Sequence, residues 1–418
     1  MLGAGLTGLA AARDLAKGGH AVDVFEREPE VGGLARGFDV GGDPLERYYH
    51  HLFTHDTAFR ALAAELGLAD ELQWLPSKMG TLRDGRLHAF GGALDLLRFT
   101  PLPFRERVRF GLGVLAARRQ TDVAALEDRT AVDWLRETFG AKGLDVIWWP
   151  LLAKKFGPHA DKVSAAWIWG KITLRGSSRE HGERLGYMRG GFQRFHEALA
   201  ADATKHGARI HLGVEATELT PGWHVSGYGP YERVLVALPT RPLLRLAGPH
   251  LAPDERGRLE RLPYRAAVVA VLTLDRPLTP YYWINVNDLD VPFGALIEHT
   301  NLISPERYGG KHVVYLSRYL GPDEPFYALP DAAVLEAFLP ALTRFNPAFK
   351  PSWVQARWVF RDAFTQPVIP PGYPRVMPPL ATSAPGLFLA NMAHIYPQDR
   401  GMNYAIALGQ RAAALMRS

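Results

Sequence analysis

The sequence predicts an α/β fold in which a βαβ unit near the N-terminus opens a parallel sheet and a second domain is joined to it. Glycines recur at positions 3, 5 and 8, and an Ala- and Leu-rich segment and a short apolar strand follow them. Strand-like and helical segments then interleave irregularly, so the companions of the first unit come only much later in the chain. The 418 residues suffice for two or three domains at roughly 100–200 residues each.

Composition excludes several classes of protein. The chain has no Cys, which rules out disulfides, Cys-ligated zinc, iron–sulfur clusters and thiol nucleophiles. The net charge of +5 comes from 48 Lys and Arg against 43 Asp and Glu, too small an excess to indicate nucleic-acid binding. No cationic start precedes an apolar run with a cleavage site, and no uncharged stretch approaches the ~18 residues of a membrane span. We expect a cytoplasmic protein without a nucleic-acid partner.

The first elements are a helix and a strand. From Leu6 an Ala- and Leu-rich helix runs to a Gly-Gly pair at 18–19, which is expected to cap it. The strand Ala21–Phe25 follows and ends at Glu26. The glycine-rich segment begins at the third residue, where a strand of about five or six residues normally precedes it. We therefore expect the first strand to be clipped by the start of this sequence.

The middle of the chain alternates between helical and strand patterns. Helices are expected between Asp56 and Asp122, from Thr130 to Phe139, and from Phe192 to His206. Strands are expected at Ala208–Leu219, Glu232–Leu238, Tyr264–Leu274, Gly294–Ile303 and Lys311–Leu320. The last forty residues indicate a strand, a loop and a helix that begins near Met402.

The spacing of the first glycines has the form GxGxxG, which is typical of dinucleotide binding. Gly3 permits a tight turn, Gly5 lets the backbone approach a pyrophosphate, and Gly8 lets the helix pack on the strand. The helix N-terminus then supplies free amides for the phosphates. Glu26 stands 18 residues beyond Gly8, where a carboxylate accepts ribose hydroxyls. The alternative is an ordinary solvated Glu at the end of a strand.

The segment after Glu26 favours a flavin over a nicotinamide cofactor. Gly32 and Gly33 offer a second close approach of the backbone, and Arg36 offers a cation near a diphosphate. In isolation, a Gly-Gly turn with a solvated Arg would explain the same residues. The position directly after Glu26 favours nucleotide binding and disfavours a plain NAD-dependent dehydrogenase.

The segment Gly3–Phe38, GAGLTGLAAARDLAKGGHAVDVFEREPEVGGLARGF, resembles the FAD-dependent amine oxidases, protoporphyrinogen oxidases and phytoene desaturases. Two further segments are similar to that family, GGFQRFHEAL at Gly190–Leu199 and PGLFLANMAHIYPQDRGMNYAIALGQRAAA near the C-terminus. The resemblance implies a glutathione-reductase-like FAD domain with a doubly wound parallel sheet and an α+β substrate domain. The FAD domain would comprise residues 1–75, 185–250 and 375–418, and the substrate domain residues 76–184 and 251–374.

Because the chain has no Cys, no cysteinyl link can form, and we expect FAD to be bound noncovalently unless a His or Tyr forms a link. The resemblance also implies that a strand residue, here Val214, would hold the adenine end through its backbone, and that the C-terminal helix would face the flavin pyrimidine. The family usually has an acidic residue where this chain has Asn391, whose amide could bind a ribityl hydroxyl instead. The expected cofactor-binding residues are Gly3, Gly5, Leu6, Thr7, Gly8, Glu26, Arg27, Gly32, Gly33, Leu34, Ala35, Arg36, Val214, Asn391, Gly401, Met402 and Asn403.

The catalytic candidates come from two polar clusters and one Lys. His50 and His51 follow the cofactor loop and could move a proton, although histidines that only satisfy packing hydrogen bonds are expected as often. Glu298 and His299 belong to a polar run within an expected strand, so side chains should point to both faces; an exposed edge is the alternative. The segment that contains Lys155 resembles a loop of the same family, in which a Lys would face the substrate. A solvated basic pair, Lys154 and Lys155, is the plainer interpretation. We expect no metal site, because no carboxylate completes a recognisable ligand spacing.

These observations predict a FAD-dependent oxidoreductase that transfers a hydride from an amine, CH–CH or CH–NH substrate to flavin N5. One alternative is a non-redox flavoenzyme acting on a sugar nucleotide, similar to UDP-galactopyranose mutase, which Arg318 and Tyr319 keep open. A further alternative is a flavin-free binding or escort protein on the same fold. The basic and apolar stretch Leu94–Arg119 indicates either peripheral membrane contact or an amphipathic lid, and the lid is the more expected of the two.

Overall fold

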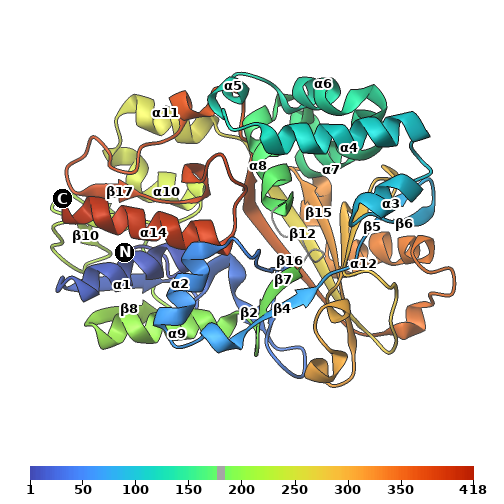
Figure 1. Cartoon of the computed structure of the whole chain (residues 1–418). Coiled ribbons are helices and arrows are strands. Elements are labelled where there is room, and N and C mark those ends of the chain that lie inside the picture. The colour runs from blue at the N-terminus through green and yellow to red at the C-terminus, as the bar shows by residue number, and fades with distance from the viewer. Residues whose placement is uncertain (177–183) are drawn as a thin grey trace.

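The structure is a computed structural model that describes residues 1–176 and 184–418. A parallel sheet with its helices lies beside a larger sheet that is covered by a helical layer (Figure 1). Both ends of the chain lie in the part that holds the parallel sheet. The arrangement is the α/β class expected from the sequence.

The parallel sheet is assembled from segments that lie far apart in the chain. Its strands are β1 (Val22–Glu26), β8 (Ala208–Leu212), β11 (Val234–Val236) and β17 (Leu387–Leu389). β1 pairs with β8, and β11 pairs with β17, each in parallel. Leu2 forms parallel bridges to Phe25 and Val236 and so joins the two pairs into one sheet. Met1 and Leu2 therefore occupy the strand position in front of the glycines, and the amide of Phe25 donates to the carbonyl of Met1 at 2.9 Å.

Helices pack on both faces of this sheet. Val24 and Leu235 belong to one hydrophobic core, whereas their strand neighbours Phe25 and Val236 belong to another, as alternation along a strand requires. The first core is covered by α1 (Leu6–Lys17), α2 (Thr57–Glu65), α9 (Gln193–Lys205) and α14 (Met402–Arg417). The second is covered by α10 (Thr240–Ala247) and α11 (Pro253–Arg261).

The two helices from opposite ends of the chain, α1 and α14, cross at very short range. A Cβ atom on Gly409 would lie 2.3 Å from the carbonyl oxygen of Thr7, so only Gly permits this approach. At the same crossing the Thr7 hydroxyl donates to the carbonyl oxygen of Ala405 at 3.1 Å. The crossing brings the N-termini of both helices to the same side of the molecule.

The larger sheet has seven strands in the order β16, β12, β15, β14, β13, β5, β6. Adjacent strands are antiparallel except β13 and β5. β12 is apolar along its length because both its faces are buried, Val269 toward the parallel sheet and Val268 toward the core under α12 (Asp331–Phe338). The strand bounds are β5 Met79–Arg83, β6 Arg86–Ala89, β12 Tyr264–Leu274, β13 Trp283–Val286, β14 Ala295–Glu298, β15 His312–Leu320 and β16 Val354–Pro367.

A layer of helices covers one end of the larger sheet (Figure 1). It contains α3 (Ala93–Arg98), α4 (Phe104–Arg119), α5 (Ala124–Glu127), α6 (Ala131–Gly143), α7 (Trp149–Phe156) and α8 (Ala165–Gly176). Its core is rich in aromatic rings, with Phe110 and Phe139 at a centroid distance of 4.8 Å. Among the helices of the described ranges, none has the length and apolarity needed to cross a bilayer.

Short strand pairs lie outside the two sheets. β4 and β7 form an antiparallel pair, as do β2 with β3 and β9 with β10. Their bounds are β2 Gly37–Phe38, β3 Leu45–Glu46, β4 Leu72–Pro76, β7 Arg184–Met188, β9 Leu219–Thr220 and β10 His224–Val225, and α13 spans Tyr373–Val376. The division of the chain into domains at residues 75, 185, 250 and 375 stays a prediction.

Three expected strands are shorter in the structure, and the one expected at Glu232–Leu238 spans only Val234–Val236. The strand expected at Gly294–Ile303 ends at Glu298, and residues 299–301 form a 3₁₀ turn. The strand expected at Ala208–Leu219 ends at Leu212, because Gly213 has a φ of +69° and its amide donates to the carbonyl of Glu28 rather than continuing the ladder.

We expect Gly409→Ala to lower the free energy of unfolding by about 1–3 kcal/mol, because its Cβ collides with the backbone of Thr7. Gly111 of α4 is the matched control, since its nearest neighbour outside the helix lies 3.7 Å from a built Cβ and Ala is the better helix former. Chemical denaturation of both variants checks this. Equal stability of the two variants would contradict a close crossing at Gly409.

Candidate functional site

A cavity of about 830 Å³ lies between the two sheets and reaches under the helical layer. The glycine-rich loop, the N-terminus of α14 and residues 25–36 line one end. The inner end is lined by α4, α7 and α8 and by strands of the larger sheet. The cavity is therefore a joint product of both parts of the fold, as substrate and cofactor sites often are.

The glycine-rich loop leaves backbone amides facing the cavity. A Cβ on Gly8 would lie 2.0 Å from the carbonyl oxygen of Gly3, so Gly8 is needed for α1 to pack against the loop. A Cβ on Gly5 would meet only Gly33 Cα, at 3.9 Å, because the residue faces open space. No side chain caps the N-terminus of α1, whose first residues, Leu6 and Thr7, line the cavity. Free amides and the positive end of a helix dipole thus face this end of the cavity.

Glu26 is held in place by the same loop. Its carboxylate accepts the amide of Ala4 at 2.7 Å and the amide of Glu28 at 3.1 Å. A carboxylate has about four acceptor positions, so hydroxyls of a ligand can still bind. Glu26 lines the cavity, as the sequence predicts for a ribose-binding carboxylate.

The second glycine turn adds a buried cation. Gly32 and Gly33 have φ values of +120° and +58°, which other residues rarely adopt. Arg36 is 6% exposed and donates to Glu28 at 2.6 Å, while its Nε has no hydrogen-bond partner among the described residues. A buried guanidinium N–H without a partner is costly unless a ligand accepts it. Arg27, Leu34 and Ala35 also line the cavity.

The N-terminus of α14 opens into the cavity at a different point. Its cap is Gly401, no side chain caps it, and Gly401, Met402 and Asn403 line the cavity. Asn391 lines it too, but its side chain already bonds Ala393 N at 3.0 Å and Leu238 O at 3.2 Å. Those bonds fix the 392–394 turn, so a bond from Asn391 to a ribityl hydroxyl stays a prediction.

Two expected cofactor residues do not line the cavity. Gly8 is used in packing α1 against the loop. Val214 donates its amide to the carbonyl of Glu26 at 2.9 Å, and it is the following residues, Glu215 and Ala216, that reach the cavity wall.

A family model described as flavin containing amine oxidoreductase matches residues 6–417. The chain belongs to this family. Membership confirms the resemblance noted in the sequence, the flavin cofactor and the oxidoreductase class.

Curated relatives match only part of this chain, and the chain spans about a third of the length of the first of them. The 15-cis-phytoene desaturase of Synechococcus elongatus is 34% identical over 151 residues, which are 32% of this chain and 32% of that protein. A solved structure named provisionally as a protoporphyrinogen oxidase of Exiguobacterium sp. 255-15 has a TM-score of 0.77 at 18% identity and covers 99% of this chain and 97% of its own. Reduced UDP-galactopyranose mutase has a TM-score of 0.75 at 16% identity, covering 100% and 93%. At such identities these structures show a common fold.

The family's cofactor fits the outer end of the cavity. Two uncapped helix N-termini, those of α1 and α14, supply donors at two separate points, and Glu26 and Arg36 supply an acceptor and a cation near the first. Among the described residues, the unpartnered Nε of Arg36 gains an acceptor if a diphosphate lies there. Glu26 matches the ribose, the α1 amides and Arg36 match the diphosphate, and the N-terminus of α14 matches the flavin ring.

His50 is neutral in the folded protein. Burial lowers the pKa of His50 to about 4. Its Nδ1 lies 2.5 Å from the carbonyl oxygen of Tyr48, and since a carbonyl only accepts, Nδ1 carries the proton and Nε2 carries the lone pair. His50 can therefore accept a proton at Nε2. The neighbouring His51 lines the cavity with its Nδ1 at 3.2 Å from the Tyr282 hydroxyl.

Lys155 belongs to a buried charge cluster. Lys155 and Lys171 lie 3.0 and 2.6 Å from the same carboxylate oxygen of Asp399. Burial alone would raise the pKa of Asp399, but the two ammonium groups hold it well below its usual range. Burial lowers the pKa of Lys155, an effect that the Asp399 charge opposes. Lys155 also stands 4.8 Å from the centre of the Trp167 ring.

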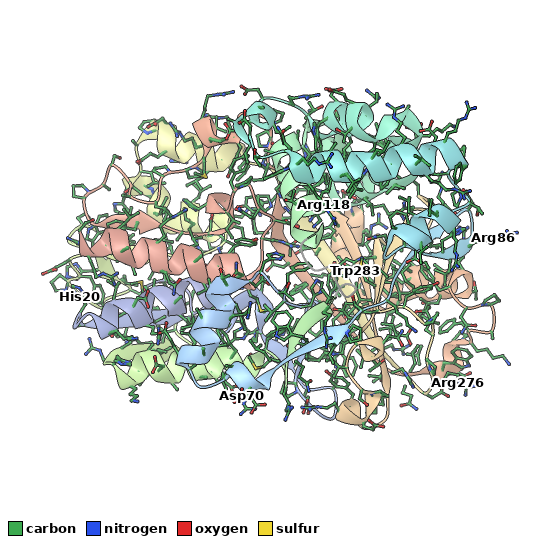
Figure 2. All side chains as sticks on the ribbon, viewed as in Figure 1. His20, Asp70, Arg86, Arg118, Arg276 and Trp283 are labelled. Carbon is green, nitrogen blue, oxygen red and sulfur yellow. The ribbon has the colours of Figure 1, made fainter. Side chains whose placement is uncertain are left out.

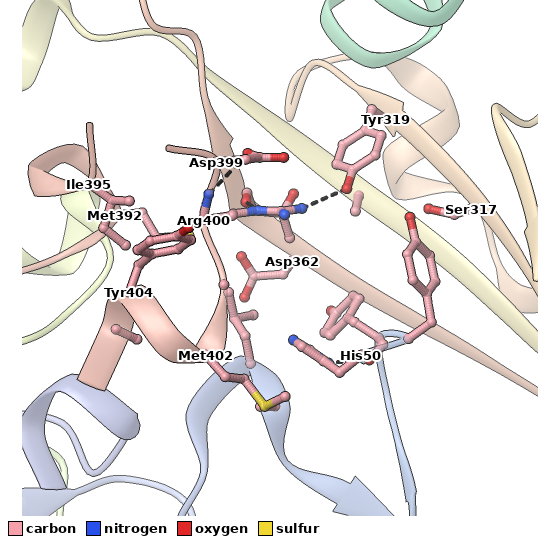
Figure 3. Close-up of a pocket in the computed structure, with 18 of the residues that line it drawn as sticks. His50, Ser317, Tyr319, Asp362, Met392, Ile395, Asp399, Arg400, Met402 and Tyr404 are labelled. Carbon is pink, nitrogen blue, oxygen red and sulfur yellow. Dashed lines mark hydrogen bonds between the residues drawn. The ribbon is translucent and has the colours of Figure 1, made fainter. Parts of the chain in front are cut away.

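Arg400 extends the cluster into the cavity (Figure 3). Its backbone amide donates to Asp399 at 3.0 Å, its Nη2 donates to the Tyr319 hydroxyl at 2.6 Å, and its Nε donates to the Thr365 carbonyl. Asp362 and His50 face the same space (Figure 3). The guanidinium is thereby fixed in one orientation beside the N-terminus of α14.

Glu298 and His299 are corrected from catalytic candidates to structural residues, because they lie outside the cavity. Glu298 is fully buried and accepts the amides of Leu278 and Thr279 at 2.8 and 2.6 Å. His299 is 2% exposed and bonds the Tyr308 hydroxyl at 2.7 Å. The expectation assumed strand alternation across these residues, but the strand ends at Glu298.

Three residues at the inner end of the cavity, Arg118, Lys171 and Asp362, were not among the sequence candidates. Lys171 could have been found from the sequence, because it is the single Lys within the apolar run AAWIWGKITL of α8. Arg118 follows Phe110 and Val114 at helical spacing on α4. Asp362 has no comparable signal, because β16 alternates polar and apolar residues along much of its length.

Glu46 anchors the loop that carries His50. It is 1% exposed and accepts the Tyr187 hydroxyl and the Phe192 amide, each at 2.8 Å. Burial raises its pKa from 4.5 to about 7. The folded state therefore holds this proton more tightly than the unfolded state, so stability falls as pH rises from about 4.5 through 7.

We expect Glu46→Gln to reduce the loss of stability between pH 4.5 and 8 by about 1–3 kcal/mol. The Gln side chain still accepts the amide of Phe192, but it does not ionise as the pH rises. Denaturation at a series of pH values checks the slope. The exposed Glu336→Gln is the control and should keep the slope of the unmodified protein. An identical slope in Glu46→Gln would contradict the assignment.

Proposed function

We propose that this protein is a FAD-dependent oxidoreductase that takes a hydride from an organic substrate bound at the inner end of the cavity. FAD, when bound, supplies the hydride acceptor. The observation that carries the proposal is that two uncapped helix N-termini, those of α1 and α14, open into one cavity together with a fixed cluster of charged side chains. Family membership supports the same class of reaction.

The residues of this chain have separate tasks in the proposal. Gly3, Gly5 and Glu26 bind the ribose and diphosphate of the cofactor. The backbone amides at the N-terminus of α14 stabilise negative charge at their own point of the cavity. His50, with its lone pair at Nε2, accepts a proton from the substrate. Arg400, fixed by Tyr319, orients a substrate oxygen.

The sugar-nucleotide mutase alternative has one observation in its favour, the shared fold. Of the two residues that kept it open, Tyr319 lines the cavity, whereas Arg318 stacks on Phe326 at 4.1 Å and donates to the Pro292 carbonyl. The two functions separate in one assay: incubation with a panel of organic substrates and UDP-sugars, following flavin bleaching and sugar isomerisation. Bleaching without isomerisation supports the oxidoreductase.

We expect Gly5→Val to abolish retention of FAD while the apoprotein keeps its stability. The Val side chain fills the open space above the loop, and nothing closer than Gly33 Cα at 3.9 Å opposes its Cβ. Visible flavin absorbance after purification with added FAD measures FAD retention. Thermal unfolding of the apoprotein measures its stability. The escort-protein alternative predicts no flavin absorbance even in the unmodified protein.

We further propose that α3 and α4 rest on a membrane surface. Exposed apolar side chains gather there: Leu94 (67% exposed), Leu97 (45%), Phe104 (65%), Val108 (43%), Leu112 (61%) and Leu115 (47%). Phe104, Val108 and Leu112 recur every fourth residue and so form one stripe along α4. The exposed Arg98 and Arg105 flank this stripe and favour an anionic surface.

We expect Leu112→Glu to weaken binding to vesicles rich in phosphatidylglycerol by about tenfold or more, because it removes buried apolar area and adds a repelled charge. Leu289→Glu, which changes a residue 57% exposed on another part of the molecule, should bind as the unmodified protein does. Vesicle flotation measures both. Equal flotation of the two variants would overturn the membrane contact and support a lid.

A further inference from the structure

Basic side chains outnumber acidic ones at the inner end of the cavity. Within the described residues, the charged side chains there are the basic Arg118, Lys154, Lys155, Lys171, Arg361 and Arg400 and the acidic Asp362 and Asp399. His50 adds no charge, since burial holds its pKa near 4. The positive charge of the inner cavity therefore exceeds the negative charge of the two acids on its wall.

Both acids are already engaged by the protein. Asp399 accepts Lys155, Lys171 and the backbone amide of Arg400. Asp362 accepts the amide of Phe364 at 2.7 Å, and burial raises its pKa. Asp362 keeps open acceptor positions, but a cationic substrate would still enter a field in which basic groups outnumber acidic ones.

Arg118 is the member of this set that lacks a partner. Its Nε and Nη2 are buried and have no hydrogen-bond acceptor among the residues that the structure describes. In Figure 2 it lies between the helical layer and the larger sheet, whereas Arg86 and Arg276 lie at the outer edge of the molecule. Lys154, by contrast, has partners: its ammonium group donates to the carbonyls of Val291 and Phe293 at 2.5 and 3.0 Å.

The surroundings of Arg118 are apolar, which strengthens its field. α4 presents Phe110, Val114 and Arg118 to the cavity, one residue per turn. α8 presents Ile168, Lys171 and Ile172 on a similar face. Each helix thus places one cation in an otherwise apolar wall, where a charge is screened less than in water.

We propose that the substrate is an organic anion, an apolar body bearing a carboxylate or phosphate group, and that Arg118 binds this group. The inference rests on the proposed oxidoreductase function and names its substrate class, which excludes simple alkylamines. A planar guanidinium with two free N–H groups on one side matches a carboxylate or phosphate in a bidentate pair. The apolar rings of α4 would cover the remainder of the molecule.

The test uses the holoenzyme and four matched probes: 3-phenylpropionate, 3-phenylpropyl phosphate, 3-phenylpropylamine and 3-phenylpropanol. Each is titrated while the flavin absorbance and the heat of binding are followed. We expect at least one of the two anions to bind about 10-fold or more tighter than the alcohol and the amine, because a charge-assisted hydrogen bond is lost in the neutral probe. The two anions, compared with each other, distinguish a carboxylate site from a phosphate site.

We expect Arg118→Met to raise the dissociation constant of the preferred anion about 10-fold or more and to leave that of the alcohol within about twofold. Arg118→Lys should restore part of the preference, since it restores the charge without the planar pair. Arg119→Met, on the exposed side of the same turn, should behave as the unmodified protein. Thermal unfolding confirms that each variant is folded.

Equal binding of all four probes, or tighter binding of the amine, would overturn the anionic substrate class. An anion preference that survives in Arg118→Met would overturn the role of Arg118. Absence of flavin absorbance in the purified protein is a separate result, since it would remove the proposed oxidoreductase function before any probe is added.

Discussion

The fold depends on one constraint, the positioning of α1 by contacts too close for any side chain. Gly8 meets the carbonyl of Gly3 and Gly409 meets the carbonyl of Thr7, so α1 is held between the glycine-rich loop and α14. The first and last helices of the chain are thereby locked at a fixed crossing. Because each helix begins at the cavity, their free N-terminal amides take fixed positions relative to each other. Backbone packing at two glycines thus sets the outer end of the site.

The inner end follows a different principle, in which buried charges orient one another. Removing Asp399 from water is costly, and two ammonium groups in direct contact with it offset that cost. The carboxylate in turn fixes the backbone at Arg400, one residue before the cap of α14. The charge cluster therefore connects α7 and α8 of the helical layer with the segment that leads into the cofactor helix. Changes in the helical layer can act on the cofactor end through this connection.

Most residues that line the outer end of the cavity can be located from the sequence, because the information is local. Glycine spacing, the strand-end Glu26 and the C-terminal helix are each read within about thirty residues. The inner end cannot be read in this way, since Lys155 and Asp399 stand 244 residues apart and meet only through the tertiary fold. Glu298 illustrates the opposite error: its strand ends early, and a polar residue that looked functional accepts two backbone amides of a neighbouring loop. Local patterns identify backbone sites, whereas side-chain clusters need the fold.

The helix α4 explains why the sequence left two interpretations of residues 94–119 open. A helix that covers a core shows one apolar face, but α4 is apolar on two, with Phe110 and Val114 at the cavity and Leu112 and Leu115 toward solvent. Its sequence consequently carries features of both a lid and an interfacial helix. The apolar side of α4 at the cavity and its apolar side toward solvent have one physical explanation if the substrate is amphiphilic. An apolar body concentrates at a membrane surface. If α4 rests on such a surface as proposed, the helix would separate the membrane from the cavity, and Arg118 at its inner face would hold the polar end of the substrate.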